Sequence, residues 1–329
     1  MTLRYATVRQ LQIFVEAART LSFARVAERL NLTPAAISFQ IKQIEGLSGF
    51  SLFERVGRRV VLTDAGRELL PCARVVLETL NAADQRMLAL KGVSGGHVTI
   101  GLVSTASCIV PHLMGRFQAD HPAVTITLLD GNRRRILEAL AKGDVDLAVI
   151  GRPPDDAEVE ATPFAPHPSV IVAAPSSPLA GSAAPLPLNA LAGQRFIVRE
   201  EGSGTRALME RFFHAAGFVP DIAMTSSSNE MIKQAVMAGM GIALISRHTI
   251  GLELACGLLC TPPVEGLPLM RSWYVAHRRH MPLLPVHARL RAFLIEQAGG
   301  LIDGGLVALP GRPAPNDDQP LQNGTAAPT

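Results

Sequence analysis

The N-terminal part of the chain carries apolar side chains at helical spacing, with one interruption. Residues 8–19 predict an amphipathic helix, because apolar positions recur at i, i+3, i+4 and i+7: Leu11, Phe14, Val15 and Ala18. Ser22 can cap a second helix. Thr33 then suits an N-cap and Pro34 suits the first position of a third helix, where its missing N–H has no cost. Two helices joined by so short a turn predict a helix-turn-helix.

The helix predicted over residues 34–45 has two faces of different chemistry. At about 100° per residue, the core-facing side collects isoleucines: Ile37, Ile41 and Ile44. The opposite side collects small, polar and basic residues and one aromatic ring: Ala35, Ser38, Phe39 and Lys42. Such a face suits the DNA major groove, with short side chains near base edges and cations near phosphates. Phe39 either contacts a thymine methyl there or packs on the neighbouring helix or hairpin.

A basic hairpin is predicted directly after this helix. Residues 52–66, LFERVGRRVVLTDAG, contain two short β-like runs, and three arginines lie at or beside the tip between them: Arg55, Arg58 and Arg59. A basic hairpin beside a recognition helix indicates a wing that contacts the DNA backbone or minor groove. A solvated basic turn is the alternative interpretation.

The positive charge of the chain is concentrated in residues 1–66. That segment holds nine Arg or Lys and five Asp or Glu, a net charge of +4, whereas the rest of the chain holds 22 basic and 23 acidic residues. A basic excess confined to the N-terminal part indicates a polyanionic partner for that part alone. Double-stranded DNA is therefore the expected partner of a domain spanning 1–66.

Residues 67–92 predict one long linker helix with a heptad seam. Apolar positions step alternately by four and three residues: Leu69, Ala73, Val76, Leu80, Ala83, Met87 and Leu90. Pro71 should kink the helix near its start. The seam predicts pairing with a second copy of the chain, so that two recognition helices read two half-sites. Packing of the seam on the protein's own domains is the alternative.

Beyond residue 93 the pattern changes to β-rich runs that alternate with helical segments. The runs are 97–103, 124–130, 145–150, 169–174, 195–199, 241–246 and 272–277, and the helical segments lie near 105–119, 132–142, 205–216, 229–239 and 285–298. This βαβ order predicts a parallel sheet with crossovers. We expect two α/β lobes with a cleft between them, lobe I from about 93–167 and 271–302 and lobe II from about 168–270. Residues 303–329, rich in Pro, Gly, Asn and Asp, predict a disordered tail.

Three junctions between a strand or loop and a helix carry Ser or Thr, and helix N-termini attract anions. Ligands of such sheets bind beyond the carboxyl ends of the strands. The candidate effector contacts are Ser104, Thr105, Asn132, Arg135, Arg152, Ser203, Gly204, Thr205, Arg206, Ser227 and Asn229. Each junction alone is an ordinary helix cap. Together they predict a small anionic effector, with a phosphorylated metabolite as the leading candidate.

Other classes of protein fit the sequence less well. No apolar run reaches the roughly 18 residues of a membrane helix, and no secretory signal precedes the first helix, so we expect a cytoplasmic protein without membrane contact. The four cysteines lack zinc-binding spacing and predict reduced thiols. The H-E-x-x-H, Walker A and G-x-G-x-x-G motifs are absent, so neither an enzyme nor a bound cofactor or metal is expected. A solute-binding protein would not need the basic N-terminal domain.

The stretch SFARVAERLNLTPAAISFQIKQIE followed by LFERVGRRVVLTDAG resembles the winged helix-turn-helix of LysR-type transcriptional regulators, and the resemblance extends over roughly residues 5–300. Within that family, LNLTPAAISFQIKQIE, LAVIGRPP and REEGSGTR are most similar to regulators of Calvin-cycle operons, which carry the genes of CO2 fixation. The resemblance implies DNA contacts at six positions: Thr33, Pro34, Ala35, Ser38, Lys42 and Arg55. Many family members have arginine where this chain has Phe39.

The same resemblance implies the architecture and the partners. We expect a periplasmic-binding-protein-like effector domain, homodimers that assemble into homotetramers, and an activator that acts on RNA polymerase at a promoter. The effectors implied are sugar phosphates, phosphoglycolate or nucleotides such as NADPH. In the expected mechanism, the effector closes the lobes, the lobes shift against the dimer, and the half-site spacing or DNA bend changes.

Overall fold

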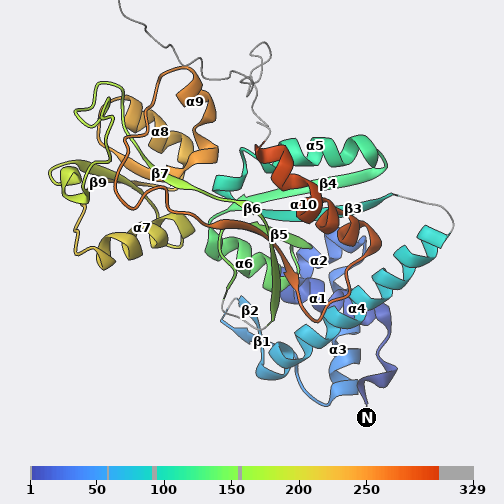
Figure 1. Ribbon diagram of the computed structural model, residues 1–329. Coiled ribbons are helices and arrows are strands. Elements are labelled where there is room, and N and C mark those ends of the chain that lie inside the picture. The colour runs from blue at the N-terminus through green and yellow to red at the C-terminus, as the bar shows by residue number, and fades with distance from the viewer. Residues whose placement is uncertain (1, 58, 91–94, 155–157, 304–329) are drawn as a thin grey trace, which may run out of the picture.

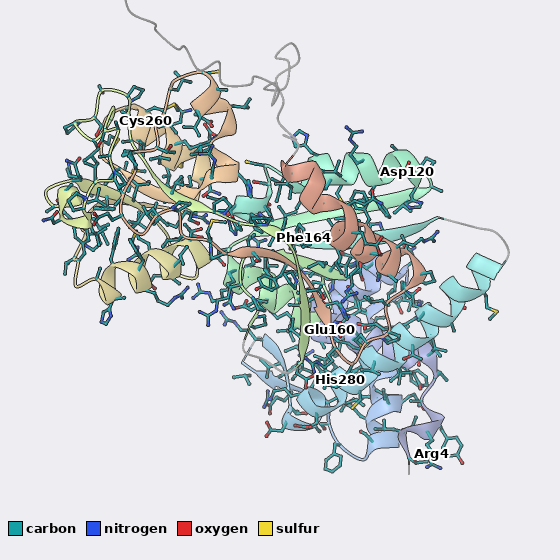
Figure 2. All side chains as sticks on the ribbon, in the orientation of Figure 1. Arg4, Asp120, Glu160, Phe164, Cys260 and His280 are labelled. Atoms are coloured by element: carbon teal, nitrogen blue, oxygen red, sulfur yellow. The ribbon has the colours of Figure 1, made fainter. Side chains whose placement is uncertain are left out.

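The structure of the chain is a computed structural model that describes residues 2–57, 59–90, 95–154 and 158–303 (Figure 1). Arg58 and the predicted tail, apart from Asp303, lie outside the described residues. The expected fold class is confirmed: a winged helix-turn-helix is followed by a long helix and a two-lobed α/β domain. Arg4 in the DNA-binding domain and Cys260 in lobe II lie at opposite ends of the molecule (Figure 2).

The N-terminal domain is built from short helices with polar caps. Its elements are η1 Leu3–Tyr5, α1 Val8–Thr20, α2 Phe23–Leu30, α3 Pro34–Ser48, β1 Phe53–Val56 and β2 Arg59–Leu62. Thr7 and Gln10 form a reciprocal capping box at the start of α1. The Ser22 hydroxyl accepts from the N–H of Arg25, and the Thr33 hydroxyl accepts from the N–H of Ala36. These caps explain why the helices restart so soon after each turn.

The linker helix α4, Asp64–Leu90, begins three residues before the predicted start and continues through Pro71. Its first turns pack on the DNA-binding domain, where Ala73 is buried in the core formed by α1, α2 and α3. Farther along, Glu78 accepts a hydrogen bond from Arg278 of the effector domain at 2.8 Å. One helix therefore contacts both domains of its own chain.

Lobe I is a five-stranded sheet in the order β4-β3-β5-β11-β6. Its elements are β3 Gly96–Val103, η2 Ser104–Ala106, α5 Val110–Asp120, β4 Val124–Gly131, α6 Arg133–Lys142, β5 Leu147–Ile150, β6 Val159–Pro166, β11 Ser272–Arg278 and α10 Pro285–Asp303. Strands β3, β4 and β5 are parallel, so their carboxyl ends share one edge. Helices α5 and α10 lie on one face of the sheet and α6 on the other (Figure 1).

Lobe II contains two strand pairs, β8 with β9 in parallel and β10 with β7 in antiparallel, joined by a parallel bridge between Phe196 and Ile242. Its elements are β7 Ser169–Val172, η3 Leu188–Leu191, β8 Arg195–Arg199, α7 Gly204–Ala215, β9 Asp221–Ser226, α8 Asn229–Met237, β10 Ala243–Ser246, η4 Arg247–Thr249 and α9 Gly251–Ala255. The chain passes between the lobes beside His167 and Arg271, whose backbones bond to each other in both directions.

Two strands escaped the sequence analysis for identifiable reasons. Strand β6 contains Pro163 and Pro166, which weaken a strand prediction because proline cannot donate to a ladder. It is tolerated because β6 is an edge strand, and the register shifts opposite it between Trp273 and Tyr274. Strand β9 also lies at an edge, and only its last residue, Ser226, is buried. The helix predicted near 105–119 is divided in the structure into η2 and α5.

Candidate DNA interface and effector cleft

The two faces of α3 are separated as the sequence predicts. Ile37, Ile41 and Ile44 are buried in the core of the domain. Thr33, Pro34, Ala35 and Lys42 are exposed, and Ser38 is half-buried. Phe39 is 58% exposed, so most of its ring is open to solvent, which favours the DNA-contact interpretation over packing on the neighbouring helix or wing.

The wing is held against α3 by a side chain within the recognition helix. The Glu45 carboxylate accepts hydrogen bonds from the N–H groups of Leu52 at 2.8 Å and Phe53 at 3.4 Å. Ser38, Lys42 and Arg55 consequently border one groove between α3 and the hairpin. Arg59 is exposed at the start of the second wing strand. The basic side chains on α3 and β1 thus face the same space, as a DNA backbone requires.

The heptad seam of α4 divides into two parts. Leu69 and Ala73 pack into the core of their own DNA-binding domain, which corrects the prediction that they lie in a dimer seam. They lie there because the first turns of α4 pack against that core and cover one side of it. Val76, Leu80 and Met87 are 44%, 42% and 57% exposed, and Ala83 is also exposed. The side chain of Leu90 lies outside the described residues.

A cleft between the lobes is bordered by residues that follow the carboxyl ends of the strands. Its lining is Val103, Ser104, Thr105, Asn132, Arg133, Gly151, Arg152, His167, Arg199, Ser203, Gly204, Thr205 and Arg271. Four arginines are among them, and no Asp or Glu is among the described residues that form the lining. A cleft with this charge and with helix N-termini beside it attracts anions.

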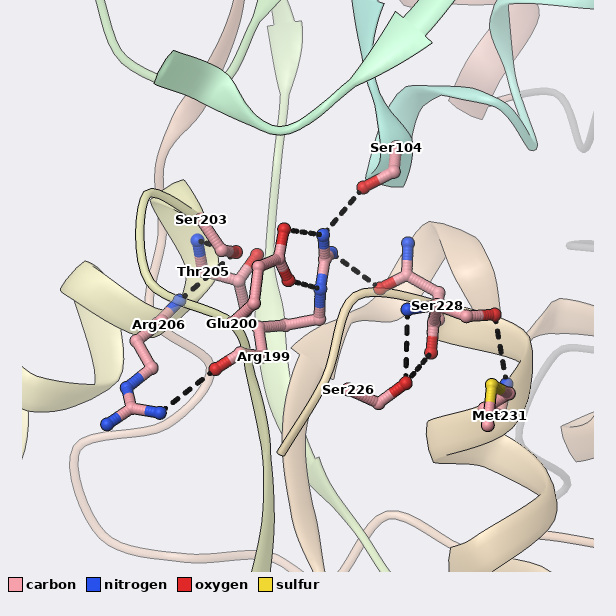
Figure 3. Close-up of polar contacts among 10 residues, drawn as sticks. Ser104, Arg199, Glu200, Ser203, Thr205, Arg206, Ser226, Ser228 and Met231 are labelled. Carbon is pink, nitrogen blue, oxygen red and sulfur yellow. Dashed lines mark hydrogen bonds and ion pairs between the residues drawn. The ribbon is translucent and has the colours of Figure 1, made fainter. Parts of the chain in front are cut away.

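The cleft is narrow in this structure. It encloses a cavity of about 20 Å³, little more than one water molecule needs. Arg199 of lobe II donates to the Ser104 hydroxyl of lobe I at 2.8 Å, so a polar contact joins the lobes at this point (Figure 3). A metabolite can therefore enter only when the lobes separate.

The floor of the cleft is a buried aromatic stack. The His167 ring lies 3.6 Å from that of Trp273, centroid to centroid, and His167 Nε2 lies 3.0 Å from the Ser246 hydroxyl. His167 Nδ1 and Arg271 Nε are buried and have no hydrogen-bond partner within the described parts of the chain. Buried polar atoms normally have partners, so both atoms are candidate contacts for a bound molecule or water.

Comparison with known proteins shows the family. Residues 8–67 match the model of the bacterial regulatory helix-turn-helix protein, lysR family, and residues 91–299 match the LysR substrate binding domain. The chain belongs to the LysR family of transcriptional regulators. No helix within the described residues of this LysR-family protein is long and apolar enough to cross a membrane.

Relatives of this LysR-family chain match over most of its length. It is 44% identical over 314 residues to the HTH-type transcriptional regulator CfxR of Cupriavidus necator, covering 93% of this chain and 99% of that protein. It is 46% identical over 287 residues to CbbR of Rhodospirillum rubrum, covering 87% and 95%. Among solved structures, the CcmR regulatory domain of Synechocystis PCC6803 in complex with 2-PG is 31% identical, with a TM-score of 0.58, covering 62% of this chain and 99% of that one.

Four of the predicted effector residues do not line the cleft of this LysR-family domain. Arg206 donates to Glu210 and to the carbonyl of Arg199, and Asn229 accepts from the Arg199 guanidinium at 2.8 Å. Ser227 is exposed, and Arg135 contributes its backbone N–H to the Asn132 cap. They flank the strand ends in sequence, but their side chains are held by other partners or project elsewhere.

The sequence analysis missed Arg133, His167, Arg199 and Arg271. Arg133 directly follows the predicted Asn132 cap, and Arg199 ends a predicted strand, so their positions could have indicated a role. His167 and Arg271 gave no signal, because they become neighbours only through the two chain crossings between the lobes. No group of side chains within the described residues could hold a metal ion.

A neutral His167 is expected to make stability depend on pH. Burial, together with Arg271 and His248, lowers the pKa of His167 from 6.5 to about 2. Below pH 6.5 the unfolded state binds a proton on His167 that the folded state does not bind. The stability that neutral His167 contributes is therefore fully present above that pH and is lost as the pH falls. From about pH 7.5 to about pH 5.5, the wild type should lose about 1.4 kcal/mol more unfolding free energy than His167→Gln. Urea unfolding of both proteins at each pH measures the difference, and equal losses would contradict it.

Proposed function

We propose that this protein binds promoter DNA of carbon dioxide-fixation genes and activates them in response to a small phosphorylated anion. The proposal rests on one observation: the same chain has an arginine-lined cleft between its lobes and an exposed recognition helix in its N-terminal domain. The names of the relatives support the target, since two further curated relatives, from Allochromatium vinosum and Acidithiobacillus ferrooxidans, are named RuBisCO operon transcriptional regulators. The bound 2-PG of the CcmR domain supports a phosphorylated effector, for which 2-phosphoglycolate is the leading candidate.

In the proposed mechanism, effector binding and DNA geometry are linked equilibria. The effector binds when the lobes are apart and favours their closure around it, because the cleft's arginines then surround the anion. Lobe I contacts α4 through Arg278 and Glu78, so a shift of the lobe is passed to the helix that leads to the DNA-binding domain. Paired chains, as dimers or tetramers, would then present two half-sites at a different spacing or bend to RNA polymerase.

The protein would act by binding alone. We propose no catalytic step and no bound cofactor or metal, with the effector, whether a phosphorylated metabolite or NADPH, as its only small-molecule partner. A regulator of chromosomal promoters acts in the cytoplasm, where its effector is also produced.

Lys42→Ala and Phe39→Ala are expected to affect DNA binding in different ways. Loss of a lysine beside phosphates should weaken binding on every sequence by about fivefold and lower the salt slope by about one. Phe39→Ala should leave random DNA unaffected and relax preference at one thymine by about fivefold, because only a methyl contact is lost. Binding measured at several salt concentrations, on operator variants and on random DNA, separates the two. Equal losses from Phe39→Ala on operator and random DNA would contradict the thymine contact.

Two measurements test the function as a whole. A gel shift with the protein's own promoter region against random DNA tests operator binding, and calorimetry with 2-phosphoglycolate, NADPH and uncharged metabolites tests the effector class. Specific DNA binding together with tight binding of an anion supports the proposal. Tight binding of uncharged metabolites only would remove the anionic effector, and equal binding of promoter and random DNA would remove the regulatory role.

A further inference from the structure

Arg199 at the end of β8 is a buried guanidinium with a carboxylate already bound to it. The Arg199 side chain is only 3% exposed. Its Nε donates to one oxygen of Glu200 at 2.9 Å, and its Nη2 donates to the other at 3.1 Å (Figure 3). This side-on pair of hydrogen bonds is the geometry by which arginine recognises a free carboxylate or phosphate.

The remaining bonds of Arg199 place its guanidinium at the effector cleft. Nη2 also donates to Ser104 of lobe I, and Nη1 donates to Asn229 at the start of α8, each at 2.8 Å. Arg199 lines the cleft, whereas Glu200 does not. The guanidinium is therefore fixed by neutral groups on both lobes, and its remaining partner is a charged group supplied by the adjacent residue.

The two members of the pair differ in their access to water. The Glu200 side chain is 22% exposed, about seven times more than that of Arg199. A carboxylate that rotates outward regains hydration, so the free-energy cost of moving Glu200 is small. Leaving the buried Arg199 guanidinium without an anionic partner would have a large free-energy cost. The pair can therefore open only if another anion replaces the carboxylate.

We propose that Glu200 is an internal competitor for the anionic effector. Its carboxylate occupies the Nε–Nη2 fork of Arg199, and a carboxylate or phosphate of the effector takes over that fork while Glu200 turns to solvent. This proposal rests on the proposed anionic effector. It adds the feature that sets the affinity of the cleft for that anion. Glu200 raises the anion concentration needed for a response, and it excludes neutral molecules, because they cannot replace a charge on a buried guanidinium.

The test compares Glu200→Gln with Glu201→Gln in the full chain. Both substitutions remove one negative charge, and Glu201 is the exposed next residue, so the control matches the change in overall charge. The side chain of the Glu200→Gln variant fills nearly the same space but binds Arg199 without charge assistance. Calorimetry with 2-phosphoglycolate and with inorganic phosphate should show binding roughly tenfold tighter for Glu200→Gln and no change beyond twofold for Glu201→Gln.

The outcomes are distinguishable. Equal tightening in both variants, no tightening at Glu200, or weaker binding by Glu200→Gln would overturn the competitor role while leaving the anionic effector in place. Absence of anion binding by the wild type and both variants would overturn the effector class and this proposal together. The gel shift with promoter DNA tests the regulatory role separately. If Glu200→Gln fails to fold by circular dichroism, Glu200→Asp withdraws the carboxylate from the fork and should also tighten binding; unchanged affinity there overturns the proposal.

Discussion

Replacing Val76 and Leu80 together by glutamate is expected to produce a monomer whose operator binding is weaker by about 10²–10⁴-fold. Both side chains are exposed on one face of α4, whereas Leu77 between them packs on the core of the DNA-binding domain. Two linked recognition helices bind two half-sites with a high effective concentration, and a monomer loses that term entirely. Charges on an apolar pairing face cannot be buried without partners. Analytical ultracentrifugation measures the assembly state, and a gel shift measures operator affinity.

Asn81→Glu is the control for position, because it places a single glutamate on the same helix but away from that face. Asn81 is exposed and borders the space between α4 and lobe I. Its variant should remain paired and bind the operator within about threefold of the wild type. A double variant that stays paired would show that the seam is not the interface, and a monomer with unchanged operator affinity would show that pairing does not determine binding.

Gly151→Ala is expected to close the effector cleft while leaving DNA binding intact. An added Cβ would lie 2.9 Å from His167 Nδ1, closer than real Cβ contacts, and 3.0 Å from its Cε1, tighter than most of them. His167 cannot retreat, because it is stacked on Trp273 and bonded to Ser246. The overlap should lower the unfolding free energy by about 1–3 kcal/mol and weaken 2-phosphoglycolate binding by about 10- to 100-fold. Calorimetry and urea unfolding measure the two effects.

Gly115→Ala provides the control for the added methyl group. Gly115 lies in α5, and a Cβ there meets nothing within 4 Å. Alanine favours a helix over glycine by about 1 kcal/mol, so this variant should be slightly more stable and should bind the anion unchanged. Unaltered anion binding by Gly151→Ala would contradict the placement of the effector against His167.

The DNA-binding domain was predictable because its signals are local. Thr33 and Pro34 fix where α3 begins, and the isoleucine spacing fixes which side is buried, so the exposed face follows from sequence. The seam of α4 was only half predictable. Leu69 and Val76 look alike in the heptad, and only the tertiary structure decides that the first joins its own domain's core.

The cleft shows where local reasoning ends. Ser104 and Ser203 were found because each lies after a strand at the start of a helical segment, where free N–H groups can hold an anion. Ser203 caps α7, whereas Ser104 is the first residue of η2 and makes no cap bond. The bond from Arg199 to Ser104 joins residues 95 positions apart, and nothing near Arg199 in sequence reveals that partner. His167 and Arg271 converge for the same reason, through the crossing of two separate chain segments between the lobes.

The position of the aromatic floor gives the protein a built-in optical signal. The chain contains a single tryptophan, Trp273, which is fully buried. It stacks on His167 and donates its indole N–H to His248. All indole emission from this protein therefore reports on one place behind the cleft, so opening and closing of the lobes can be followed by its wavelength and quenching without attaching a dye.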